Sequence, residues 1–142
     1  MTALSADRNY LSKKGEVKAC PMEQSETIYK GSLVGNDADG YAIPASDTSG
    51  QVFRGVSIEN KVADASADGT FTVRCQKKGE VQLTYGAAGG AASQALVGTV
   101  VEVVDSGTVD TAAHTTNHVK VGPVTEVLSG TSVMVDISGY AV

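Results

Sequence analysis

The sequence predicts an all-β protein, and three observations carry that prediction. Apolar residues make up 42% of the 142 residues, Val and Ala dominate them, and 16 glycines are spread along the chain. β-Branched side chains fit the pleated surface of a sheet, and glycine serves tight turns between short strands. Several segments alternate apolar and polar residues, whereas helical spacing is nearly absent. We expect a compact small β-barrel or sandwich domain of short antiparallel strands with an extended N-terminal arm.

The arm is expected over residues 1–14 and the β domain over 15–142. Leu4, Tyr10 and Leu11 are isolated apolar residues in the arm, and no strand or helix period is sustained there. Such a segment cannot bury a face on its own domain, but its apolar side chains can fill pockets on a partner. We therefore predict that these three residues bind the partner.

Two hairpins are the clearest local predictions. In the first, alternating residues over 71–75 and 81–85 flank a turn over 76–79. In the second, an apolar stretch over 124–128 leads through Ser129-Gly130 to alternation over 133–137. Further strands are expected at 16–20, 27–34, 41–43, 52–59, 99–104 and 119–121. The one expected helical turn lies at 91–96.

An internal repeat is visible in the sequence. The pentapeptide Lys-Lys-Gly-Glu-Val occurs at 13–17 and again at 77–81, an offset of 64 residues. Val34 and Asp37 precede 53–56 much as Val103 and Asp105 precede 121–124, at offsets of 67 to 69. Two interpretations stay open. One is a duplicated β unit over 13–60 and 77–126, and the other is chance repetition among turn-and-strand sequences of few residue types.

Charge and cysteine usage exclude several classes of partner. The net charge is −5 and the isoelectric point is about 4.9, which opposes attraction to nucleic acid or anionic lipid. No apolar run approaches the roughly 18 residues of a membrane span, and the N-terminus has no signal-peptide core. We expect synthesis in a cytoplasm, with neither nucleic acid nor membrane as a partner. Cys20 and Cys75 lack a paired spacing and are expected to be free thiols that pack in strands.

Candidate chemical motifs each lack a required member. The nucleophile elbow G-x-S-x-G is absent. His114 and His118 have the spacing of helical zinc ligands, but the residues between them disfavour a helix and no further ligand is indicated. Segment 36–40 matches a calcium loop in part, and an Asx-rich turn explains it better. The glycine-rich run 86–92 lacks the Lys of a phosphate loop. We expect no enzyme activity, no cofactor and no metal.

Five turn-and-strand segments carry a family resemblance. They are IYKGSLV (28–34), GYAIPA (40–45), FRGV (53–56), ALVGTV (95–100) and VKVGPV (119–124). With a polar arm before them and a Val-rich hairpin over 133–137 after them, they resemble the small capsid decoration, or cement, proteins of tailed bacteriophages. The resemblance covers the chain from about Gly15 to Tyr140.

The resemblance implies a structural virion protein without enzyme activity. It would be made in the host cytoplasm and bind the outer surface of an icosahedral head, where it bridges major capsid protein subunits and stabilises the shell. Members of that family usually bind as homotrimers. Two alternatives stay open: another virion component of the tail or head-completion type, and a carbohydrate-binding β module. The absence of Trp counts against the sugar-binding alternative, because sugar sites normally present aromatic platforms.

Self-association is also expected from the residues themselves. Val101, Val103, Val119 and Val121 are apolar positions in excess of what a thin monomer core was expected to cover. We therefore predict that these four residues lie at an oligomer interface.

Overall fold

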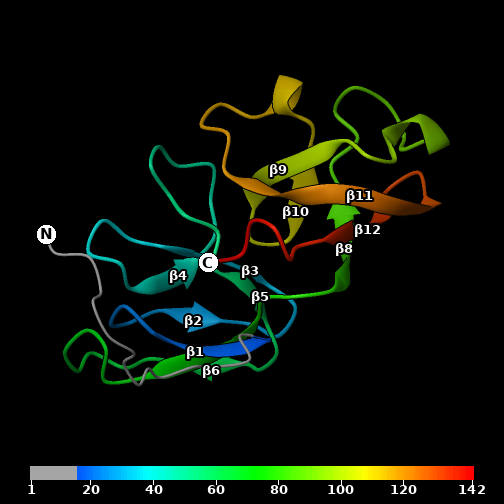
Figure 1. Ribbon diagram of the computed structural model, residues 1–142. Helices are drawn as coiled ribbons and strands as arrows, with labels where there is room; N and C mark the ends of the chain where they lie inside the picture. Colours follow the sequence, from blue (N-terminus) through cyan, green and yellow to red (C-terminus); the bar gives the residue numbers. More distant parts are fainter. Residues whose placement is uncertain (1–15) are drawn as a thin grey trace, which may run out of the picture.

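A computed structural model describes residues 16–142, and it confirms the all-β fold (Figure 1). The first half of the chain contains β1 (Val17–Pro21), β2 (Thr27–Ile28), β3 (Leu33–Asn36), β4 (Ala42–Pro44), β5 (Gly55–Ser57), β6 (Lys61–Val62) and β7 (Thr72–Gln76). The second half contains β8 (Glu80–Tyr85), β9 (Val100–Asp105), β10 (Thr108–Asp110), β11 (Lys120–Ser129) and β12 (Ser132–Asp136). Two 3-10 turns, η1 (Gln94–Leu96) and η2 (Ala112–His114), lie in the second half.

The first half forms a five-stranded sheet, and we call residues 16–76 the sheet unit. Its strand order is β1-β7-β5-β3-β4, and all neighbouring strands are antiparallel. A single parallel bridge between Met22 and Ala42 brings the two outer strands together. β2 and β6 form a separate two-stranded ribbon. The core of this unit consists of Cys20, Met22, Ile28, Val34, Ala42, Ala63, Val73 and Cys75.

The second half forms a closed barrel, and we call residues 80–142 the barrel unit. Its strand order is β10-β8-β12-β11-β9, with β9 returning to β10. The β8–β10 pair is parallel and joins Thr84 to Thr108 and Tyr85 to Val109, whereas the other pairs are antiparallel. Closure of the barrel removes the open sheet edges that would otherwise invite pairing with other chains.

The prediction of an oligomer interface at four valines is wrong. Val101, Val103 and Val121 have no exposed surface and Val119 is 3% exposed, because all four belong to the core of the barrel unit. Side chains that are already buried within one chain cannot contact another. The expectation failed because it underestimated the core, which also receives side chains from the sheet unit.

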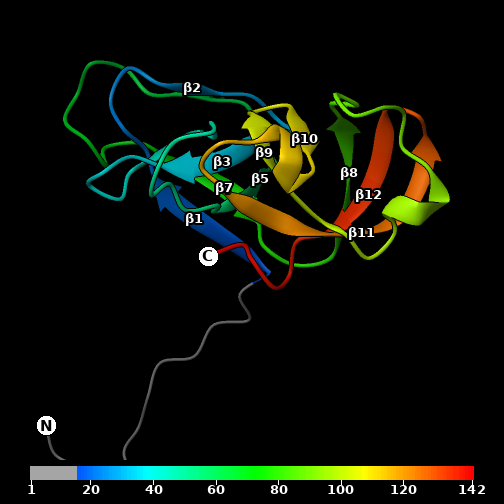
Figure 2. The ribbon, with the colours of Figure 1, turned by 90° about the horizontal axis from the view of Figure 1, so that it is seen from above.

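The two units pack together as one body. Leu33, Ala45, Phe53 and Val56 come from the sheet unit but belong to the core of the barrel unit. Backbone hydrogen bonds reinforce this packing, since Leu33 N donates to Ser106 O over 2.8 Å and the C-terminal Val142 N donates to Phe53 O over 3.0 Å. Figure 2 shows the two groups of strands side by side, with the strands from β8 onward on the right.

One predicted hairpin is confirmed and the other is wrong. β11 and β12 pair antiparallel, with Val124 opposite Val135 and Val127 opposite Val133. β7 and β8 do not pair, because β7 is already bonded on both sides: Cys75 lies opposite Lys18 of β1 and opposite Ser57 of β5. The chain instead passes through residues 77–79 into the barrel unit, where β8 pairs with β12 and β10.

Shorter elements depart from the predicted boundaries. The expected strand over 27–34 is divided into β2 and the beginning of β3, and β6 and β10 were not predicted. The expected helical turn is confirmed as η1, whereas η2 was not foreseen. Within residues 16–142, no helix is long and apolar enough to cross a membrane.

Candidate functional site

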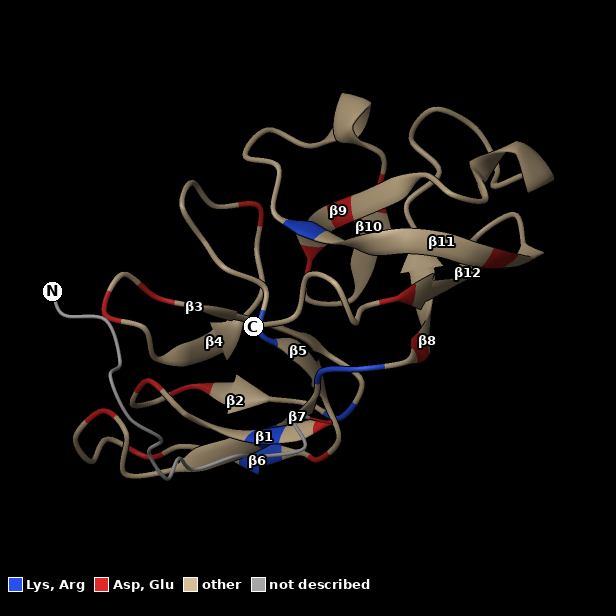
Figure 3. Ribbon diagram, viewed as in Figure 1, with Lys and Arg blue, Asp and Glu red and all other residues tan. Residues whose placement is uncertain are grey.

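Three loops at one end of the molecule form a surface that is almost free of charged residues. They span 44–51, 86–99 and 111–119, and we call their surface the uncharged face. Asp47 is the one Lys, Arg, Asp or Glu in these segments, whereas charged residues make up 19% of the chain. In Figure 3 the loops around η1 and η2, at the upper edge of the view, are tan. Side chains here are mostly Ala, Gly, Ser and Thr, and both histidines of the chain lie among them.

Asp47 joins the loop 44–51 to the loop 111–118. Its carboxylate accepts hydrogen bonds from Thr116 N and Asn117 N, both over 2.8 Å. The Asn117 side chain donates to Asp47 O, also over 2.8 Å. The hydrogen bonds from Thr116 and Asn117 hold the pKa of Asp47 below its usual value. Loops from the two units therefore meet at a charge-assisted contact.

The loop 111–118 is also anchored to the barrel beneath it. Glu102 on β9 is 3% exposed, and its carboxylate accepts a hydrogen bond from the Thr115 hydroxyl. His118 Nδ1 lies 2.8 Å from the same carboxylate oxygen, so the neutral tautomer that bonds to it carries its proton on Nδ1. A buried carboxylate is costly without such partners. The contact therefore explains how this loop is held over the barrel.

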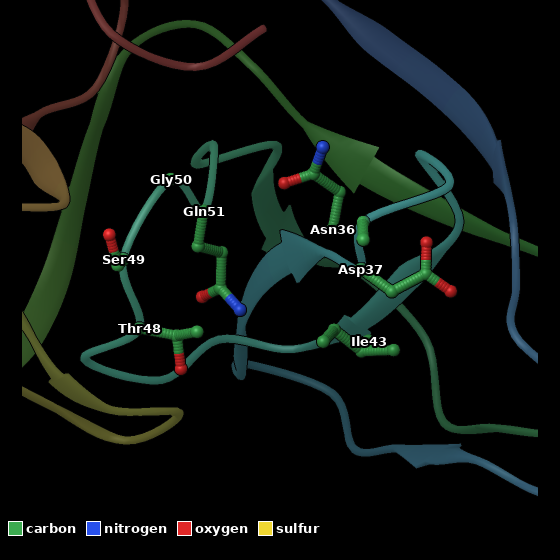
Figure 4. A pocket seen from close by; sticks show the side chains of 8 residues that line it. Asn36, Asp37, Ile43, Thr48, Ser49, Gly50 and Gln51 are labelled. Atoms are coloured by element: carbon green, nitrogen blue, oxygen red, sulfur yellow. The ribbon is translucent and has the colours of Figure 1, made fainter.

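The loop 44–51 is anchored by a different side chain at the corresponding place. Gln51 lies directly over Gly35 of β3, where a β-carbon on residue 35 would be only 2.5 Å from Gln51 Cδ. Gln51 Oε1 accepts a hydrogen bond from Ser46 N over 2.8 Å, and Asn36 Oδ1 accepts one from Val52 N over 2.7 Å. Figure 4 shows these side chains around a hollow of about 180 Å³. Its polar groups hold the loop itself, so we assign this hollow a structural role.

The third loop is fixed by a second buried carboxylate. Asp110 is 1% exposed and accepts hydrogen bonds from Ala88 N over 3.1 Å and Thr111 N over 2.7 Å. Burial and the nearby Asp110 carboxylate raise the pKa of Tyr85. Between residues 89–96 of this loop and the segment that includes Thr111 and His114 lies an open hollow of about 260 Å³. This hollow gives the uncharged face a concave part.

The predicted partner-binding residues Leu4, Tyr10 and Leu11 lie outside the described residues. Cys20 and Cys75 are buried free cysteines, as expected. The hydrogen bond to Cys20, together with burial, raises the pKa of the Cys75 thiol. A buried thiol with a raised pKa is a poor nucleophile, which supports a packing role for this pair.

The remaining motifs form loops and turns. The interpretation of 36–40 as an Asx-rich turn is confirmed, since Asp37 Oδ1 accepts hydrogen bonds from Asp39 N over 2.9 Å and Tyr41 N over 2.8 Å. His114 and His118 lie in a loop and have separate contacts, His114 over Gly89 and His118 on Glu102. Among residues 16–142, no cluster of three or more His, Cys, Asp or Glu could hold a metal ion.

Sequence reasoning did not identify the uncharged face. Its three loops are far apart in the chain, and each was interpreted separately as a turn or a flexible loop. The signal that could have found it is the local absence of charge over 86–99 and 111–119 in a chain that is otherwise rich in Asp and Glu. No family model and no curated protein matches the chain.

Proposed function

We propose that the protein is a structural virion protein that decorates the outer surface of an icosahedral phage head. The proposal rests on the sequence resemblance to capsid decoration proteins and on the uncharged face. Its partners are the major capsid protein and further copies of the chain, in a homotrimer, and its role is to bridge shell subunits without enzyme activity. The arm, with Leu4, Tyr10 and Leu11, adds to the attachment.

The observation that carries the proposal is the uncharged face itself. Cores of protein interfaces are depleted in charged residues, because burying an unpaired charge is costly. Short side chains such as Ala, Ser and Thr also lose little conformational entropy on binding. Because Asp47, Glu102 and Asp110 tie the three loops to the body, little further ordering is needed when a partner docks. A surface of this kind favours a protein partner over a nucleic acid or an anionic lipid.

Binding to undecorated heads of the phage that encodes the chain tests the proposal. We expect saturable, stoichiometric binding by the full-length protein. Ala113 is exposed on η2, and Ala113→Lys should weaken the binding at least tenfold by placing a charge in the interface. Thr72→Lys on β7 is the matched control, because it adds the same charge at an exposed position outside the uncharged face. Absence of saturable binding by the unmodified protein would exclude this function.

A further inference from the structure

The sheet unit and the barrel unit have the same strand arrangement. Their strand orders are β1-β7-β5-β3-β4 and β8-β12-β11-β9-β10. In both units the neighbouring strands are antiparallel, and in both the first strand meets the last in parallel. In the sheet unit the parallel contact is the Met22–Ala42 bridge, and in the barrel unit it includes the Tyr85–Val109 pair. Five strands therefore correspond one to one.

The correspondence extends to individual residue pairs. The pair Gly35–Ile43 on β3 and β4 recurs as Glu102–Asp110 on β9 and β10. The pair Asn36–Ala42 recurs in the same way as Val103–Val109, and Val34–Gly55 recurs as Val101–Gly122. Each of these residues has its counterpart 67 residues later. Residues 33–57 and 100–124 therefore match without a gap.

A glycine with unusual backbone geometry occupies the same place in both units. Gly55 has φ +133°, and a β-carbon there would lie 2.3 Å from Gln76 O of β7. Gly122 has φ +157°, and a β-carbon there would lie 2.0 Å from Asp136 O of β12. Both positions require the backbone of the neighbouring strand to approach a residue without a side chain. Shared strand order alone would not require this detail.

The amino-acid sequence keeps traces of the same match. Six of the residues in 33–57 are identical to their counterparts: Val34/Val101, Gly40/Gly107, Ala45/Ala112, Thr48/Thr115, Val52/Val119 and Gly55/Gly122. The repeated pentapeptide, in contrast, is displaced by one residue. Val17 lies opposite Gln76, and the barrel residue opposite the corresponding Asp136 is Glu80 rather than Val81. A slip of one residue turns a side chain to the other face of a strand, so the two valines are not equivalent.

The two units also have corresponding loops on the uncharged face. The loops 44–51 and 111–118 have equal length and follow corresponding strands, β4 and β10. Each is held by its last residue at the corresponding strand position, Gln51 over Gly35 and His118 on Glu102. Asp47 then holds the two loops next to each other through Thr116 and Asn117. One chain therefore presents two versions of the same loop side by side.

We propose that the chain is a duplicated barrel unit whose loops 44–51 and 111–118 dock on two neighbouring copies of one protein subunit. This inference rests on the proposed function and specifies the partner as a pair of adjacent shell subunits. Two corresponding loops on one rigid body match a surface that occurs twice, as the surface of a regular shell does. Binding through one loop places the other near its own site, so the affinity of the chain exceeds that of either loop alone.

Matched substitutions in the two loops test this inference. Ser49 and Thr116 are exposed counterparts 67 residues apart, and lysine at either position adds one charge to one loop. We expect Ser49→Lys and Thr116→Lys each to weaken binding to undecorated heads at least tenfold, and the double variant to lose more than either single variant. Thr72→Lys is again the control, and circular dichroism with thermal melting shows whether each variant is folded.

A reconstruction of decorated heads gives a second measurement that needs no variant. The expected result is that the two loops of one chain contact the same residues on two different subunit copies. Contact of both loops with a single copy, or loss of binding from only one of the two single variants, would overturn the inference and leave the proposed function standing. If the unmodified protein does not bind heads at all, the proposed function itself fails.

Discussion

At the scale of single residues, the two glycines that face a neighbouring backbone should limit stability most sharply. Gly122→Ala would place a β-carbon 2.0 Å from Asp136 O, at a φ that side chains rarely adopt. Because backbone atoms cannot move aside cheaply, we expect the free energy of unfolding to fall by about 3 kcal/mol. Urea denaturation followed by circular dichroism measures it. Gly55→Ala should have an effect of the same size.

Gly139→Ala is the matched control for these variants. Residue 139 is exposed, and a β-carbon there would meet nothing within 4 Å. Its stability should stay within about 0.5 kcal/mol of the unmodified protein. Equal effects at Gly122 and Gly139 would show that the close approach between strands carries no special cost.

Asp47 should make the contact between the two loops sensitive to acid. Its pKa is lowered in the folded protein by the hydrogen bonds from Thr116 and Asn117, so the folded state binds the proton less readily than the unfolded state. The stability that it contributes is present above the unfolded pKa, about 3.9, and is lost as the pH falls through the lower folded pKa. We expect at most about 1 kcal/mol, because the group is partly solvated.

The comparison with Asp47→Asn isolates this contribution. The unmodified protein should be more stable than the variant at pH 6, and the difference should shrink as the pH falls below 4. Urea denaturation at several pH values measures the difference. A gap that is constant from pH 6 to pH 2.5 would mean that the Asp47 carboxylate does not stabilise the contact.

At the scale of elements, alternation of apolar and polar residues predicted strands well and their partners less well. Strands β7 and β8 both alternate and follow one another closely, which is the usual signature of a hairpin. Alternation reports only that one face of a strand is buried, however, and β7 buries its face in the sheet unit while β8 buries its face in the barrel. The β11–β12 hairpin was predictable because both of its strands face the same core.

The candidate site was less accessible to sequence reasoning than the strands. The contact of Asp47 with Thr116 and Asn117 spans about 70 residues, and no local pattern in either loop indicates it. Likewise, the buried Glu102 lies in a strand whose other inner residues are valines, and its partners Thr115 and His118 follow more than ten residues later. Such contacts depend on the closure of the barrel, which is a property of the tertiary structure.

The N-terminal arm remains a prediction from the sequence at this scale. Removing residues 1–14 should leave the β domain folded, since every strand lies downstream. It should weaken binding to undecorated heads at least tenfold, or about 1.4 kcal/mol, because the apolar contacts of the arm are lost. Binding isotherms for the full-length and shortened proteins, with circular dichroism as a folding control, measure this. Equal affinities would place the whole docking surface on the described residues.

At the scale of the whole molecule, the shared core should make the two units unfold together. Phe53 belongs to the sheet unit, is 2% exposed and packs in the core of the barrel unit. Opening of the sheet unit would therefore expose apolar surface of the barrel as well. We expect labelling of the Cys20 and Cys75 thiols, which reports on the sheet unit, to occur at the same urea concentration as amide exchange in β11 and β12, which reports on the barrel.

Two phenylalanine variants distinguish coupling between the units from stability within one of them. Phe71 packs only against the core of the sheet unit, so Phe71→Ala should lower both transitions by the same amount while they remain coincident. Phe53→Ala removes a side chain shared by the two units, at a cost of about 3 to 5 kcal/mol, and should separate the transitions, with thiol labelling at the lower urea concentration. If the transitions stay coincident in Phe53→Ala, the coupling is carried by the Asp47 contact and the C-terminal hydrogen bond to Phe53 O instead. If they are already separate in the unmodified protein, the two units are independent folding units.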